Sequence, residues 1–106
     1  MKAPLEGIRV IDMTSVVVGP LCTQTLADYG ADVIKVEAPP GGDIARTLAG
    51  RGVTPLMSGK FLHLNRNKRS LALDLKKPGA MDALRRLLKI SDVLVWNVRP
   101  PAMKRL

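Results

Sequence analysis

Aromatic, histidine and cysteine side chains are scarce in this sequence. Its 106 residues include one Phe, one Tyr, one Trp, one His and one Cys. A single cysteine excludes an internal disulfide, which fits a reducing compartment. A single histidine leaves no recognisable spacing of metal ligands. Single-strand nucleic-acid binders rely on aromatic platforms, and neither these nor a helix-turn-helix or zinc-finger pattern is present.

Long apolar runs are absent as well. No stretch approaches the ~20 apolar residues of a membrane span, and the N-terminus lacks the apolar core and cleavage site of a signal peptide. The composition, 46% hydrophobic and 25% charged, is that of a soluble globular protein. We therefore expect a cytoplasmic protein the size of one ordinary domain, with no metal, no membrane partner and no nucleic-acid partner.

Acidic residues are few in the later part of the chain. Residues 1–43 hold three basic and six acidic residues, whereas residues 44–106 hold fourteen basic and three acidic ones. This asymmetry suggests either a polyanionic ligand or an acidic surface against which the basic part packs. A solvated basic face, which needs neither, is the alternative.

Short apolar runs alternate with helical patterns along the chain. We expect strands at Gly7–Met13, Ala31–Glu37, Ser70–Leu75 and Asp92–Asn97, and helices from Pro20 to Gly30 and from Pro78 to about Ile90. In the first of these helices, Leu21, Thr25/Leu26 and Tyr29 lie near helical spacing. Residues 38–59, rich in Gly and Pro, are expected to form a long loop, and residues 98–106 another.

This order of elements predicts an α/β fold with a Rossmann-like, mainly parallel sheet built from two βαβ units. In such sheets ligands bind beyond the carboxyl ends of the strands. Four segments leave those ends, and we expect them to border one crevice: Thr14–Gly19, Ala38–Asp43, Lys76–Pro78 and Val98–Pro101.

Lys76 and Lys77 directly precede the second expected helix. Cations are unfavourable there by about 0.3–1 kcal/mol, because the helix dipole already places positive charge at that end. A bound phosphate would reverse the sign by using the free N–H groups and the lysines together. The alternative, equally compatible with the sequence, is that the side chains of Lys76 and Lys77 point into water and bind no anion. Arg99 and Arg105, after the last strand, could add donors to the same anion.

Single residues with reactive side chains have no companion in the sequence. Cys22 lies among apolar neighbours and is expected in the core rather than as a nucleophile, and Trp96 is also expected in the core. Asp12 and Asp43 favour turn or capping roles, and His63 a structural or exposed position. The GxGxxG loop of dinucleotide folds is absent, so a nicotinamide cofactor is not expected.

Three segments are specific as a set. They are PLEGIRVIDMT…VGPLCTQTLADYGADVIKVEAPPGGDIAR, LNRNKRSLALDLKKPGA and SDVLVWNVRPPAMKRL. In order and spacing, from Leu5 to Leu106, they resemble the N-terminal segment of the family III CoA-transferases, which include formyl-CoA:oxalate and carnitine CoA-transferases and the α-methylacyl-CoA racemases. The resemblance implies a longer, interlocked homodimeric protein, in which residues 1–106 are the N-terminal part of a Rossmann-like, CoA-binding large domain.

The resemblance also implies an activity. The transferases move CoA between carboxylic acids through an aspartyl-CoA thioester, with an acyl-CoA and a carboxylic acid acceptor as substrates, and the racemases exchange the α-proton of an acyl-CoA. By the same resemblance the nucleophilic aspartate lies beyond Leu106, so no catalytic residue is assigned here and whether this chain alone is an enzyme stays open. A non-catalytic basic module that binds an acidic partner or a nucleotide is the alternative from another class.

By position, the resemblance assigns ten coenzyme A contacts. They are Val17, Val18, Leu73, Asp74, Leu75, Lys76, Asn97, Val98, Arg99 and Arg105. Ala38 stands where several members of the family have an arginine. CoA carries a pyrophosphate and a ribose 3′-phosphate, so it is the sort of polyanion that the charge pattern suggests.

A second basic cluster, Arg66, Lys68 and Arg69, lies at the other end of the third expected strand. It is some way from the expected crevice. The sequence leaves three roles open for its charge: stabilising the fold, contacting a second subunit in a dimer, or binding a distal phosphate.

Overall fold

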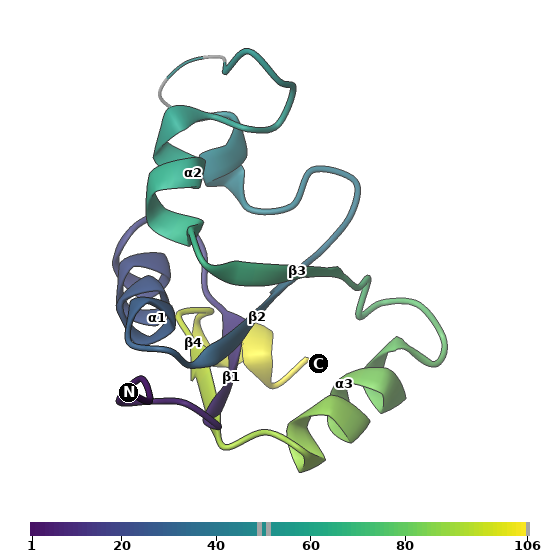
Figure 1. Cartoon of the computed structure of the whole chain (residues 1–106). Helices are drawn as coiled ribbons and strands as arrows, with labels where there is room; N and C mark the ends of the chain where they lie inside the picture. Colours follow the sequence, from purple (N-terminus) through teal and green to yellow (C-terminus); the bar gives the residue numbers. More distant parts are fainter. Residues whose placement is uncertain (49, 51, 106) are drawn as a thin grey trace.

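A four-stranded parallel sheet forms the centre of the molecule. The computed structural model describes residues 1–48, 50 and 52–105. In these residues the strands are β1 (Arg9–Met13), β2 (Asp32–Glu37), β3 (Lys68–Ala72) and β4 (Val93–Trp96), in the order β3-β2-β1-β4 (Figure 1). The first four strands of the doubly wound dinucleotide fold have the same order. The predicted α/β fold with a mainly parallel sheet is confirmed.

Helices cover both faces of this sheet. The helical segments of the described residues are α1 (Val18–Asp28), the 3-10 turn η1 (Ile44–Arg46), α2 (Gly59–Asn65), α3 (Ala80–Lys89) and α4 (Pro100–Met103), and α1 and α3 cover the two faces. Ala27 of α1 packs with Val10 and Val33 on one face, and Leu84 of α3 packs with Ile11 and Ile34 on the other. Successive strand residues point to opposite faces, so the central strands supply both layers of the core.

The two predicted βαβ units differ in how their strands lie. β1 and β2 are parallel neighbours, and α1 connects them. β3 and β4 occupy opposite edges of the sheet, so the connection through α3 crosses the sheet (Figure 1). No helix in the described part of the chain is both long and apolar enough to cross a membrane.

The boundaries of β3 differ from the prediction of Ser70–Leu75. Its pairing with β2 begins at Lys68 and ends at Ala72. Leu73 N still donates to Glu37 O at 2.8 Å, but Asp74 then accepts a hydrogen bond from Lys76 N and turns the chain. The stretch from Leu73 to Lys76 is therefore a loop at the carboxyl end of the sheet, not part of a strand.

Two short helices and a 3-10 turn lie where loops or no regular element were predicted. η1 lies inside the long loop of residues 38–59, of which Ala49 and Arg51 are outside the described residues. Ser58 caps α2 by accepting a hydrogen bond from Phe61 N at 3.1 Å. α4 begins with Pro100 and Pro101, which suit a first turn because its N–H groups have no partner there.

The buried face of α1 matches the predicted spacing only in part, because Leu26 packs against the core but the other large side chains do not. The buried residues are Pro20, Thr23, Gln24 and Ala27. Leu21 and Tyr29 are 46% and 54% exposed, and Cys22, predicted in the core, is exposed too. The cause is polar: Thr23 Oγ1 donates to the buried Asp12 Oδ2 at 2.7 Å.

The predicted core position of Trp96 is also wrong. This residue is 50% exposed, because it lies in the edge strand β4, which the sheet borders on one side only.

Candidate functional site

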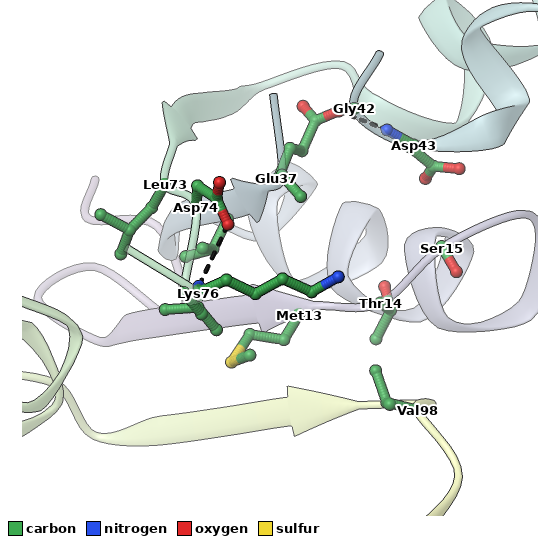
Figure 2. A pocket seen from close by; sticks show the side chains of 13 residues that line it. Met13, Thr14, Ser15, Glu37, Gly42, Asp43, Leu73, Asp74, Lys76 and Val98 are labelled. Carbon is green, nitrogen blue, oxygen red and sulfur yellow. Dashed lines mark hydrogen bonds between the residues drawn. The ribbon is translucent and has the colours of Figure 1, made fainter. Parts of the chain in front are cut away.

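A cavity of about 320 Å³ opens at the carboxyl ends of the strands (Figure 2). Its size falls at the lower end of the range for small-molecule sites, about 300–1,000 Å³. The lining residues are Met13, Thr14, Ser15, Val36, Glu37, Ala38, Gly42, Asp43, Leu73, Asp74, Leu75, Lys76 and Val98. Each of the four segments that were expected to border one crevice contributes to this wall.

The ten predicted CoA contacts divide between the pocket wall and its surroundings. Those in the wall are Leu73, Asp74, Leu75, Lys76 and Val98. Asn97 lies beside it and binds both Ser15 N, at 3.0 Å, and Ser15 O, at 2.9 Å. The others are outside the wall: Val17 and Val18 at the start of α1, Arg99 at the start of α4, and Arg105.

Lys76 brings a positive charge to the pocket. Figure 2 shows its side chain extended across the cavity, with the ammonium group directed toward Thr14. Among the described residues no carboxylate forms an ion pair with Lys76, Arg99 or Arg105. An extended lysine without such a partner can meet an anion in a pocket that is otherwise mainly apolar.

Asp74 shapes the turn that carries Lys76. Its Oδ1 accepts from Lys76 N at 3.1 Å, and its carbonyl accepts from Lys77 N at 2.9 Å. This is the local hydrogen bonding by which Asp favours turns. α3 begins at Ala80 rather than at Pro78, so Lys76 and Lys77 lie farther from its N-terminus than expected. The helix-dipole argument for a phosphate at these lysines is correspondingly weaker, because that effect fades within one turn.

Glu37 is a pocket carboxylate whose charge is already neutralised. Arg46 binds both of its oxygens at 2.8 Å, and Asp43 N donates to Oε2 at 2.8 Å. Burial by itself raises the pKa of Glu37, but the hydrogen bonds from Arg46 and Asp43 outweigh it and hold the pKa below its ordinary value. Glu37 is therefore ionised and held by Arg46, which makes it a poor base.

Asp43 is neutralised in the same way. Its Oδ2 lies 2.9 Å from Lys35 Nζ, and the two side chains are 1% and 2% exposed. Its Oδ1 accepts from Ala45 N at 2.9 Å and so caps η1, as the predicted capping role requires. Burial raises the pKa of Asp43, but the contacts with Ala45 N, Lys35 and Val16 N together lower it below its usual range.

Asp12 is a fully buried carboxylate in β1. It accepts from Thr14 N at 2.9 Å, which is the predicted turn role, and it also pairs with Lys68 Nζ at 2.8 Å. Burial again acts to raise the pKa of Asp12, but the hydrogen bonds from Lys68, Thr14 and Thr23 lower it overall. Asp12 thus joins β1, β3 and α1.

The second basic cluster serves the fold. Arg66 pairs with Asp28 at 2.7 Å, Lys68 with Asp12 and Arg69 with Asp32, both at 2.8 Å. Every one of these acidic partners lies in residues 1–43. For this cluster, the acidic surface suggested by the charge asymmetry is the chain's own earlier part.

Thr14, Ser15, Glu37 and Asp43 are pocket residues that the predicted set of contacts did not include. The available signal was Lys35, a charged residue in the middle of the apolar run DVIKVE. A lysine buried in a central strand requires an acidic partner near the same strand end.

His63 is exposed, one of the two positions that the sequence predicted for it. In the part of the chain that the structure describes, no three His, Cys, Asp or Glu side chains gather as metal ligands would.

Curated proteins of known name resemble the whole chain. A formyl-CoA:oxalate CoA-transferase of Bradyrhizobium sp. (strain ORS 278) is 47% identical over 106 residues, which are all of this chain and 25% of that protein. The enzyme of the same name from Rhodopseudomonas palustris (strain TIE-1) is 46% identical over the same shares. The chain therefore spans about a quarter of the length of the curated relatives it matches.

Solved structures share the fold. A hypothetical protein from Mycobacterium tuberculosis superposes with a TM-score of 0.83 at 43% identity, over 97% of this chain and 27% of the other. A CAIB/BAIF family protein from Brucella suis gives a TM-score of 0.87 at 35% identity, over 99% and 28%. The model of CoA-transferase family III matches residues 5–106. The chain thus belongs to the family III CoA-transferases.

Proposed function

We propose that this chain supplies part of the CoA-binding crevice of an enzyme that moves CoA between carboxylic acids. The observation that carries the proposal is the pocket at the carboxyl ends of the strands, which the turn from Leu73 to Lys76 borders and which the Lys76 side chain crosses. Ligands of open α/β sheets bind in this position, and family membership supports an acyl-CoA as the ligand.

The lining of the pocket suits one portion of CoA. Apolar side chains such as Met13, Val36 and Leu73 can cover a pantetheine arm, while backbone groups of the turn bind its amides. CoA is larger than a cavity of about 320 Å³. Its phosphates would therefore lie at the rim and outside, where Lys76, Arg99 and Arg105 offer positive charge.

The chemical step needs a carboxylate that this pocket does not leave free. Arg46 holds Glu37 and Lys35 holds Asp43, whereas Asp74 closes the turn before Lys76. We therefore propose that residues 1–106 bind CoA, and that an aspartate elsewhere in the enzyme forms the aspartyl-CoA thioester. The names of the relatives make formyl-CoA and oxalate the first donor and acceptor to test.

Titration with CoA, followed by NMR or calorimetry, tests the binding role. Lys76→Ala and Arg99→Ala should each weaken binding several-fold, because each removes a cation that can contact a phosphate. Lys89→Ala is the matched control. Lys89 is exposed at the C-terminus of α3. This end of α3 leads into the amino end of β4, whereas the pocket lies at the carboxyl ends of the strands, so binding should be unchanged.

Two results would count against this function. One is a folded wild-type chain that does not bind CoA. The other is binding that single-stranded DNA displaces as well as CoA does, which would indicate a general polyanion surface instead.

A further inference from the structure

Three consecutive residues between β1 and α1 are each held by a side chain from elsewhere in the chain: Lys35 of β2, Asn97 just after β4, and Asp43 before η1. Lys35 Nζ donates to Thr14 O at 2.8 Å. Asn97 binds the N–H and the carbonyl of Ser15. Val16 N donates to Asp43 Oδ1 at 3.1 Å. Thr14 and Ser15 line the pocket, so these contacts fix the position of one of its walls.

Val16 has a backbone conformation that its side chain disfavours. Its φ is +73°, in the left-handed region, where a β-branched residue is a true outlier. Such a conformation is strained and persists only where the surroundings fix it. Here the surroundings are Asp43, which binds the Val16 amide, and the contacts that hold the two preceding residues.

The anchor of this arrangement is a buried ion pair. Lys35 lies in the central strand β2, and neither it nor Asp43 reaches solvent to more than 2%. An apolar pair of similar volume is often as stable as a buried ion pair or more so. The pair therefore contributes more to the geometry of the loop than to stability. Lys35 donates to Thr14 O, and Asp43 accepts from Val16 N.

We propose that Lys35 and Asp43 are positioning residues that hold Thr14, Ser15 and Val16 in the shape the pocket needs before the ligand arrives. This rests on the proposed function, since the ligand is taken to be CoA. Lys35 does not line the pocket, and although Asp43 does, its carboxylate oxygens are already held by Lys35, Val16 N and Ala45 N. Their effect on binding is through the loop, whose pre-set shape spares the ligand the cost of ordering it.

The test compares the 106-residue chain with the double variant Lys35→Met/Asp43→Asn, which removes both charges and leaves neither unpaired. Three quantities are measured: the thermal midpoint, the amide hydrogen exchange of residues 14–18, and the dissociation constant for CoA. The double variant should exchange the Val16 amide at least about tenfold faster and bind CoA about tenfold more weakly, since small displacements of positioning groups have effects of this order.

Val10→Ala is the matched control. Val10 is buried near the amino end of β1 and packs with Ala27 and Val33, away from the pocket. This variant should lower the thermal midpoint and leave both CoA affinity and the relative exchange of residues 14–18 unchanged. If the double variant does not fold, Asp43→Asn alone replaces it. That change removes the charge opposite Lys35 but keeps an Oδ1 that can accept from Val16 N, and it should speed exchange at residues 14–16 and weaken CoA binding.

The inference is overturned if the loop exchanges as slowly in the variant as in the wild type, or if it exchanges faster while CoA binds with equal strength. A folded wild-type chain that does not bind CoA overturns the proposed function instead. The exchange of the Val16 amide then decides whether the ion pair holds the loop.

Discussion

Lys68 places its charge inside the molecule, where its ammonium group binds Asp12 Oδ2, Pro20 O and Asn65 Oδ1 at 2.8–2.9 Å. Its side chain is 2% exposed and that of Asp12 not at all. Three donors meet three acceptors, so the ammonium group is fully satisfied. The neighbouring Arg69, whose side chain is 63% exposed, pairs with Asp32 at the surface.

Lys68→Met should lower the free energy of unfolding by about 3–5 kcal/mol, because it leaves the Asp12 carboxylate buried without its counter-charge. Arg69→Gln should change it by no more than about 1 kcal/mol, as is usual for an exposed pair. Urea denaturation at neutral pH measures both. Equal losses in the two variants would mean that burial does not set the strength of these pairs.

Among single residues, the sequence indicated part of the pocket wall better than the residues that hold that wall in place. Leu73–Lys76 were placed by a short motif, and the structure puts all four in the pocket wall. The contacts of Lys68 with Asp12 and of Val16 with Asp43 join residues 56 and 27 positions apart. Local patterns carry no information on such pairs, so the buried polar network could not be predicted.

Among the elements, α2 depends on one hydroxyl group. Ser58 Oγ accepts from Phe61 N at the start of the helix and donates to Ala45 O of η1. Ser58→Ala should therefore destabilise the protein by about 1–2 kcal/mol, since a cap is lost and a buried carbonyl loses its donor.

Thr25→Ala in α1 is the comparison for Ser58→Ala. Thr25 is exposed and its hydroxyl donates to Leu21 O within the same helix, so alanine should be neutral or slightly stabilising through its higher helix propensity. Thermal unfolding of both variants decides the point. A loss at Thr25 as large as that at Ser58 would contradict the proposed capping role.

The elements with regular apolar periodicity were predicted, and those fixed by polar contacts were not. α3 was expected from the spacing of its leucines, and Leu84 does face the core. α2 is short and capped by a serine in a region rich in Gly and Pro. The buried face of α1 follows the Thr23 contact with Asp12, so Leu26 packs against the core while Leu21 and Tyr29 are exposed, and hydrophobic spacing alone gave only part of this face.

The whole molecule joins an acidic first part to a basic second part. Four acidic residues of the first part, Asp12, Asp28, Asp32 and Glu37, pair with bases that follow residue 43. Their partners lower the pKa of each of these carboxyl groups. A lowered pKa in the folded state gives stability that is present above the ordinary carboxyl values of 3.8 and 4.5 and is lost as the pH falls through the lower folded values.

The free energy of unfolding should therefore be nearly constant from neutral pH to about pH 5 and fall steeply below about pH 4. Urea denaturation at a series of pH values measures it. Asp32→Asn, which removes the partner of Arg9 and Arg69, should flatten the acid limb. Glu6→Gln, at an exposed residue, should not. Stability that rises on acidification would contradict the assignment.

The position of β1 between β2 and β4 also sets the order in which the sheet can form during synthesis. β1 leaves the ribosome before β2, β3 and β4, and because Val10 pairs with Val93, one side of β1 lacks this neighbour until β4 has been made. Until then its free N–H and C=O groups are an open edge on which another nascent chain could pair. Of these four strands, the one made last thus protects the one made first.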